Sequence, residues 1–264
     1  MKKRIISAII ALIIVVPLII MGEEAFNIGI YIIAMLALKE FFDIRKKQMP
    51  IFIQLIAYIF MTLLILLNTN SNTANFIIDY RILIALFMTL LIPTVLYHDK
   101  EKYNANDAFY LIGGILFLGI SMSLFITVRN ISLNIFVFLL LISMINDIFA
   151  YISGTLIGKR KLLTDISPKK TWEGMIIGTL MSVFIGALFY HTIIDPMFSK
   201  EKLLIICTFL SILGVFGDLT FSAIKRYYDK KDFGNIMPGH GGVLDRLDSL
   251  IFVILGYMFF ITMF

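Results

Sequence analysis

The sequence contains little cysteine and little charge. Cys207 is the only cysteine among 264 residues, so the chain forms neither an internal disulfide nor a cysteine-based metal cluster. Charged residues make up 16% of the sequence, compared with about 25% in a typical soluble domain. The net charge of +5 is too small to indicate nucleic-acid binding, and we expect no nucleic-acid partner. These shortages argue against a soluble globular protein.

Long apolar runs take the place of the missing charge, and 59% of the residues are hydrophobic. A helix that crosses a bilayer needs ~20 mostly apolar residues, because its backbone finds no water in hydrocarbon. We therefore predict an all-α, polytopic integral membrane protein with about nine transmembrane helices, forming a single transmembrane domain over residues 1–264. The predicted helices span residues 5–21, 26–42, 50–68, 82–97, 108–127, 131–152, 174–195, 202–221 and 249–264.

The first run also has the composition of a signal peptide, because Lys2, Lys3 and Arg4 precede it. No small-residue cleavage site follows this run, so we expect a retained helix. Basic residues predict the orientation, since cytoplasmic loops are rich in lysine and arginine. With a cytoplasmic N-terminus, 19 of the 23 basic residues fall in inside segments. The distribution supports both the helix count and a location in the cell membrane, with two long cytoplasmic segments at residues 153–173 and 221–248.

The second cytoplasmic segment follows Asp218, which ends an apolar run. Ser222 and Lys225 come at i+4 and i+7, so they share a helical face with Asp218. A carboxylate at the edge of hydrocarbon is costly unless it faces a partner or water. Together the three groups can seat a metal–phosphate complex. A helix end whose Lys225 and Arg226 reach toward the interface explains them equally well.

A glycine-rich turn, Pro238 to Gly242, surrounds His240, and backbone N–H groups in such turns can hold an anion. Asp245 and Asp248 follow at i and i+3, where the last helix is expected to begin. Carboxylates suit Mg²⁺, so we expect Asp218, Asp245 and Asp248 to hold one or two metal ions. Two alternatives stay open: Asp248 is a helix cap, and His240 fixes the loop without a catalytic role.

The first cytoplasmic segment has its own candidates. Asp147 lies within the sixth apolar run, and a buried carboxylate in a spanning helix is a candidate functional residue. Ser167, Lys169 and Lys170 offer a hydroxyl and two ammonium groups that suit a polyphosphate. The basic run from Lys159 to Lys161 is better explained by attraction to anionic lipid.

Four segments of this sequence resemble the signature of the phosphatidate cytidylyltransferase (CDP-diacylglycerol synthase) family. They are Ser222-x-Ile224-Lys225-Arg226, Lys231-Asp232-x-Gly234, Pro238-x-His240-Gly241-Gly242 and Asp245-Arg246-x-Asp248. Residues 147–158 and 167–174 also resemble the family, whereas the first five helices do so only in hydropathy. The catalytic motifs therefore lie in residues 131–264. Met237 is a departure from the family pattern, but it is apolar and conservative.

The resemblance implies the reaction CTP + phosphatidate → CDP-diacylglycerol + pyrophosphate, a nucleotidyl transfer in phospholipid biosynthesis. It implies Mg²⁺ as cofactor, with one or two metal ions of which one can be monovalent, a homodimer in the lipid bilayer, and an active site facing the cytoplasm. The residues expected in catalysis are Asp218, Lys225, Asp245, Arg246 and Asp248. The residues expected to bind the nucleotide and its metal are Asp147, Ser167, Lys169, Lys170, Ser222, Arg226, His240, Gly241 and Gly242.

Two other classes of protein fit part of the pattern. A CTP-dependent lipid kinase would use a similar site but transfer the γ-phosphate and release CDP. A transporter or lipid-binding protein would also contain a buried Asp147 and basic loops. A CDP-alcohol phosphotransferase is disfavoured, because Ser249 and Leu250 follow Asp248 where that class requires a different motif.

Overall fold

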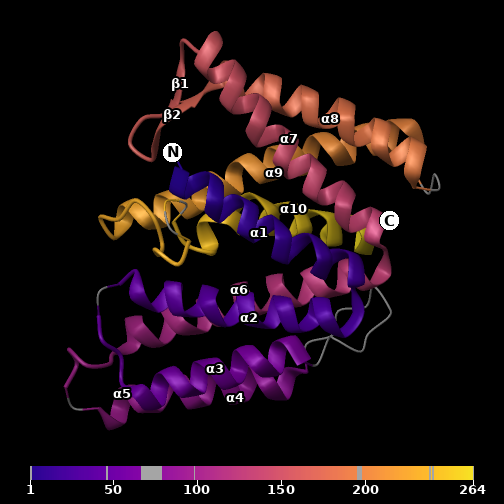
Figure 1. Ribbon diagram of the computed structural model, residues 1–264. Coiled ribbons are helices and arrows are strands. Elements are labelled where there is room, and N and C mark those ends of the chain that lie inside the picture. The colour runs from indigo at the N-terminus through magenta and orange to yellow at the C-terminus, as the bar shows by residue number, and fades with distance from the viewer. Residues whose placement is uncertain are drawn as a thin grey trace. The chain divides into compact units, whose positions relative to one another are not determined.

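The computed structural model describes residues 2–45, 47–66, 79–97, 99–194, 198–237, 239 and 241–263. The chain divides into two compact units (Figure 1). The first unit contains Met1–Asn130 and Phe233–Val243, and the second contains Ile131–Asp232 and Leu244–Phe264. The segment Phe233–Val243, which includes the glycine-rich turn, thus belongs with the N-terminal helices.

The first unit is a helical bundle. Its helices are α1 (Lys2–Met21), α2 (Glu23–Asp43), α3 (Ile51–Leu66), α4 (Tyr80–Leu91), α5 (Pro93–Leu96) and α6 (Ala105–Ile131). Glycines on α6 allow neighbouring helices to approach closely. A Cβ on Gly114 would lie 2.1 Å from Cε1 of Phe41 on α2, and one on Gly119 would lie 2.7 Å from Cδ1 of Leu64 on α3. Most of the side chains on α6 are buried, so this helix forms the centre of the unit.

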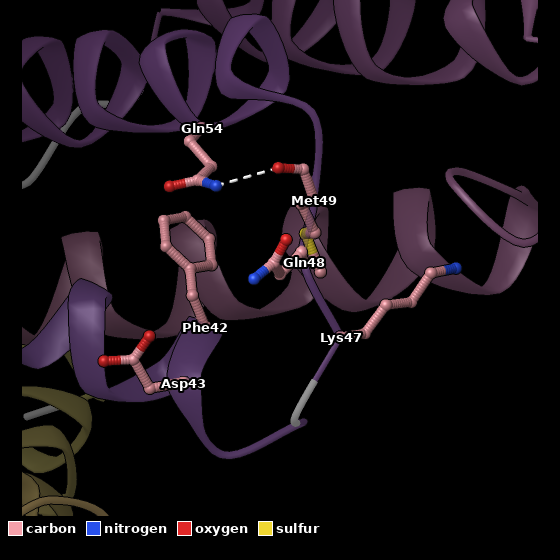
Figure 2. A pocket seen from close by; sticks show the side chains of 6 residues that line it. All are labelled: Phe42, Asp43, Lys47, Gln48, Met49 and Gln54. Atoms are coloured by element: carbon pink, nitrogen blue, oxygen red, sulfur yellow. Dashed lines mark hydrogen bonds between the residues drawn. The ribbon is translucent and has the colours of Figure 1, made fainter.

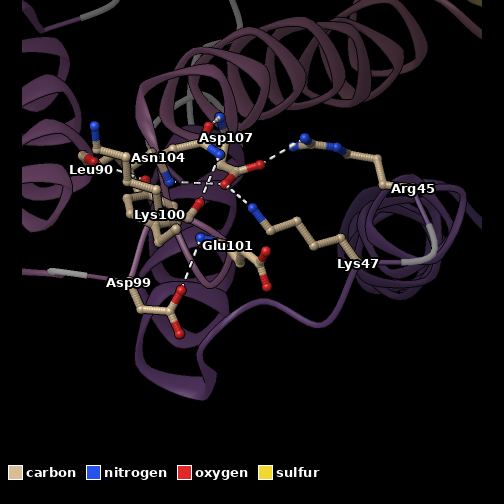
Figure 3. Close-up of polar contacts among 9 residues, drawn as sticks. Arg45, Lys47, Leu90, Asp99, Lys100, Glu101, Asn104 and Asp107 are labelled. Atoms are coloured by element: carbon tan, nitrogen blue, oxygen red, sulfur yellow. Dashed lines mark hydrogen bonds and ion pairs between the residues drawn. The ribbon is translucent and has the colours of Figure 1, made fainter.

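Polar contacts tie both ends of α6 to the rest of the first unit. At its C-terminal end, Nε of Arg129 donates to the carbonyl oxygen of Ile19 at 2.6 Å. At its N-terminal end, the fully buried Asp107 pairs with Arg45 at 2.6 Å and with Lys47 (Figure 3). The backbone N–H of Asn104 donates to the same carboxylate at 2.9 Å. Asp107 is therefore a structural anchor whose charge is fully compensated.

The second unit contains the sequence motifs. Its elements are α7 (Leu133–Leu156), β1 (Lys161–Leu163), β2 (Ser167–Thr171), α8 (Trp172–Ile193), α9 (Lys200–Tyr227) and α10 (Leu244–Met263). Small residues of α8 at four-residue spacing face α7. A Cβ on Gly178 would lie 2.6 Å from Oδ1 of Asn146, whose Nδ2 donates to the carbonyl oxygen of Ser211 on α9 at 2.9 Å. Asn146 thereby sets how α7, α8 and α9 meet.

Strands β1 and β2 form an antiparallel hairpin between α7 and α8. Thr171 ends β2 and caps α8, where its hydroxyl accepts from the N–H of Gly174 at 3.1 Å. Gly154 and Gly158 make room for the Thr171 side chain, because a Cβ on either would approach its Oγ1 to 3.0 or 2.8 Å. The sequence predicts a loop here, and the hairpin is a departure from that prediction.

The helical prediction is otherwise confirmed, because each of the nine predicted segments overlaps a described helix, with α4 and α5 sharing residues 82–97. Five described helices (α2, α6, α7, α8 and α9) are long and apolar enough to cross a membrane. The chain is thus a predominantly α-helical membrane protein. Two boundaries were predicted too conservatively: α9 continues through Lys225 to Tyr227, and α10 begins at Leu244, ahead of Asp245 and Asp248.

Candidate active site

Helices α9 and α10 approach each other at Gly217, next to Asp218. A Cβ on Gly217 would lie 2.6 Å from the carbonyl oxygen of Asp248, so only glycine permits this approach. The carboxylates of Asp218 and Asp248 lie close enough to repel each other. Asp248 lies inside α10, so it does not cap this helix. Gly217, which belongs to none of the motifs, thus allows the predicted metal ligands Asp218 and Asp248 to lie on closely packed helices.

A lysine from the β-hairpin reaches Asp218. The ammonium of Lys170 lies 2.6 Å from Oδ2 of Asp218, and both side chains are about one-quarter exposed. The hydroxyl of Ser222, one turn further along α9, donates to Oδ1 of Asp218 at 3.2 Å. The segment at residues 153–173 therefore contacts α9 through the ion pair between Lys170 and Asp218.

A second ion pair joins α9 to α10. The ammonium of Lys225 donates to Oδ1 of Asp245 at 2.7 Å, and both side chains are at least nine-tenths buried. Burial strengthens the interaction, and removing either partner would leave a buried charge without its hydrogen-bonded partner in this pair. Asp245, a predicted metal ligand, is thus already paired with Lys225.

Asp147 joins the same group of charges from α7. Its carboxylate interacts electrostatically with Asp218, Lys170 and Arg246. Asp147 lies within the candidate membrane span α7, as predicted, and its side chain is not covered by other helices of the protein, whereas its neighbour Asn146 is buried. We call the set of Asp147, Lys170, Asp218, Lys225, Asp245, Arg246 and Asp248 the charged cluster.

Other predicted site residues lie around the charged cluster. The guanidinium of Arg226 donates to the carbonyl oxygens of Ile166 at 3.3 Å and Lys230 at 3.0 Å, so Arg226 supports the hairpin and the end of α9. Ser167 pairs with Leu163 across the hairpin. Lys169 is exposed on β2, and successive residues of a strand point to opposite faces. Lys170 is therefore the member of the pair that turns toward Asp218.

Four carboxylates and three cations make the charged cluster a candidate metal site. Within the part of the chain that the structure describes, no three acidic, histidine or cysteine side chains already form a metal-binding group. The set of Asp218, Asp245 and Asp248 stays a prediction. A cation between Asp218 and Asp248 would relieve the repulsion between their carboxylates, and Asp245 is paired with Lys225 through Oδ1.

The glycine-rich turn belongs to the first unit. Gly239 and Gly241 have φ angles of 80° and 85°, which favour glycine, and the N–H of Met237 donates to the carbonyl oxygen of Gly241 at 3.0 Å. Gly242 lies against Glu40 of α2. His240, a predicted binding residue, lies outside the described residues.

A pocket in the first unit is lined by residues that are distant in sequence from the predicted site residues. Its volume is about 240 Å³, and it is lined by Phe42, Asp43, Lys47, Gln48, Met49 and Gln54 (Figure 2). Nε2 of Gln54 donates to the carbonyl oxygen of Met49 at 2.9 Å across this lining. None of the predicted site residues contributes to it, so the pocket does not guide the assignment of the site.

Comparison with known proteins identifies the family. The sequence profile of the cytidylyltransferase family matches residues 2–264. The chain therefore belongs to this family, and it is an enzyme of the nucleotidyltransferase class.

Individual relatives have a more specific name. The phosphatidate cytidylyltransferase of Bacillus subtilis (strain 168) is 34% identical over 269 residues, covering 100% of this chain and 98% of the relative. The phosphatidate cytidylyltransferases of Staphylococcus haemolyticus (strain JCSC1435) and Staphylococcus aureus (strain COL) are each 35% identical, over 96% of both chains. The similarity extends through the N-terminal helices, where the sequence motifs alone gave no resemblance.

Proposed function

We propose that this chain is a phosphatidate cytidylyltransferase, which converts CTP and phosphatidate to CDP-diacylglycerol and pyrophosphate. The observation that carries the proposal is the match to relatives of that name over essentially the whole chain. The charged cluster supports it, because a reaction between two phosphates needs groups that neutralise and align negative charge.

In the proposed reaction, a phosphate oxygen of phosphatidate forms a bond to the α-phosphorus of CTP. The bond from that phosphorus to the bridging oxygen of the β-phosphate breaks, and pyrophosphate leaves with the electron pair. A phosphate monoester is already ionised near neutral pH, so no side chain has to act as a general base. This requirement fits a site built from lysine, arginine and aspartate.

The roles of individual residues follow from their contacts. A divalent cation such as Mg²⁺, held by Asp218 and Asp248 with Asp245 as a further ligand, would neutralise charge on the reacting phosphates. Lys170 would exchange Asp218 for a CTP phosphate, and Ser167 and Lys169 lie on the same strand as further candidates for phosphate contact. Lys225 and Arg246 would balance the charge on the leaving group, and Arg246 can do so by bidentate contact.

We also propose nine membrane spans, a cytoplasmic N-terminus, an active site that faces the cytoplasm, and a homodimer. Contacts within each unit support the predicted alternation of the loops between the two sides of the membrane. Arg129, which is predicted outside, contacts Ile19 near the predicted outer end of the first helix. Arg226 contacts Ile166, and both are predicted inside.

The single cysteine makes this topology testable. In a Cys207→Ala background, a cysteine at Glu101 should react with an impermeant maleimide only after the cytoplasmic side is opened. A cysteine at Tyr80 should react from outside in intact cells. The reverse pattern would contradict the orientation, and light scattering of the purified protein in detergent would test the dimer.

Label transfer tests the reaction itself. Purified protein is incubated with phosphatidate, Mg²⁺ and CTP labelled at the α-phosphate. We expect the label to move into the lipid fraction in parallel with release of pyrophosphate. Label that stays in CDP, with γ-label moving to a lipid alcohol, would identify a lipid kinase instead. An absence of CTP turnover would favour a transporter or lipid-binding protein.

A further inference from the structure

We propose that Glu40 is a positioning residue that holds the glycine-rich segment Phe233–Val243 in its working conformation. Glu40 lies on α2, in the part of the chain that shares no motif with the signature. The inference deepens the proposed function and rests on it, because the segment contains Gly241 and Gly242, two predicted substrate-binding residues. All contacts that support it lie within the first unit.

The carboxylate of Glu40 is enclosed by this segment. Glu40 is 2% exposed, and its Oε1 accepts the backbone N–H of Val243 at 2.8 Å. A Cβ on Gly234 would lie 2.6 Å from the same oxygen, and one on Gly242 would lie 2.4 Å from it. Phe233 and Val243 are also buried, so both ends of the segment are attached. A carboxylate removed from water in this way requires compensating hydrogen bonds, which here come from the loop.

These contacts lie next to predicted site residues in the sequence. Val243 lies two residues before Asp245, so the hydrogen bond from Val243 to Glu40 fixes the backbone directly ahead of a predicted catalytic carboxylate. Gly241 and Gly242 immediately precede Val243. A displacement of the Val243 amide would therefore shift the N–H groups of Gly241 and Gly242.

The contacts also separate the roles of adjacent glycines. Gly241 has a φ of 85°, so its backbone conformation alone explains why this position is a glycine. Gly242 is not among the positive-φ glycines, and the nearest atoms to a Cβ there all belong to Glu40. Glycine at 242 is therefore required by the Glu40 carboxylate, in addition to any anion that its backbone N–H holds.

A double-mutant cycle tests the assignment. Glu40→Ala should lower kcat/KM for CTP about 100-fold in the folded fraction, mainly through a higher KM, because a shift of about 1 Å in a substrate-positioning segment has an effect of this size. Glu40→Gln should retain activity within roughly tenfold, because the amide oxygen still accepts the Val243 N–H. Gly242→Ala should resemble Glu40→Ala, and the double variant should be no worse than Glu40→Ala alone. Glu24→Ala, an exposed glutamate on the same helix, is the matched control and should behave as wild type.

Hydrogen exchange at the Val243 amide provides a readout independent of turnover. Exchange should accelerate in Glu40→Ala and remain slow in Glu40→Gln and Glu24→Ala. The proposal is overturned if Glu40→Ala folds with wild-type KM and exchange, or if Gly242→Ala lowers activity further in the Glu40→Ala background. If wild-type protein shows no CTP turnover, the proposed function fails, while the exchange pattern still decides whether Glu40 holds the segment.

Discussion

Two groups of charges, one in each unit, differ in how well they are balanced. In the first unit, one buried carboxylate, Asp107, meets two cations, Arg45 and Lys47, and a backbone N–H. In the charged cluster of the second unit, four carboxylates meet three cations, and Asp218 and Asp248 repel each other. Both groups contain aspartate, lysine and arginine, so composition does not distinguish them.

We interpret the first group as structural and propose that the second serves the chemistry. A carboxylate with all its partners supplied by the protein gains nothing from a ligand and stabilises the fold. Carboxylates that repel each other, with lysines that can be exchanged, are stabilised by a cation and by phosphate. The comparison predicts opposite consequences for similar substitutions in the two groups.

The largest expected effect is on activity in the second unit. Asp218→Asn removes the charge at the centre of the cluster while keeping the shape of the side chain. We expect label transfer from CTP to lipid to fall roughly 1,000-fold, because electrostatic stabilisation is lost where charge develops. The thermal unfolding midpoint in detergent should stay close to that of wild type, since Asp218 is part-exposed. Near-normal turnover would remove Asp218 from the active site.

A matched change in the first unit should affect stability instead. Asp107→Ala leaves Arg45 and Lys47 without their buried partner, and we expect the free energy of unfolding to fall by roughly 3 kcal/mol. The surviving folded protein should transfer label at the wild-type rate. A stable variant with low activity would show that the two groups are not separated as described.

The smallest expected effect distinguishes two adjacent lysines of β2, Lys169 and Lys170. Lys170→Ala should raise the KM for CTP roughly tenfold, because a lysine that contacts a phosphate is worth about one charge-assisted hydrogen bond. Lys169→Ala should raise it several times less, since this side chain is exposed and does not pair with Asp218. Steady-state kinetics of both variants checks the ranking, and equal or reversed effects would contradict the orientation of β2.

The sequence predicts the helices well because hydropathy is a local property. It also predicts that Asp218, Ser222 and Lys225 share a face, because they lie on one helix. Pairings between elements, such as Lys170 with Asp218, depend on how helices rotate and approach, and hydropathy does not determine either. The close approach of α9 and α10 depends on Gly217, and no pattern in its apolar run marks that glycine.

Glu40 was missed for a different reason. It is a carboxylate near the end of an apolar run, the feature that drew attention to Asp147. Applied to residues 26–42, the same rule would have found it. The same rule thus leads to two different places: Asp147 belongs to the charged cluster, whereas Glu40 is buried against the glycine-rich segment.

The most direct test of the central claim is Mn²⁺ binding to the purified protein, measured by electron paramagnetic resonance in the presence of CTP. The account predicts a bound Mn²⁺ signal in wild type that persists in Asp107→Asn and is lost in Asp218→Asn and Asp248→Asn. Binding that is unchanged in both of the latter variants would contradict the claim that the charged cluster of the second unit holds the catalytic metal.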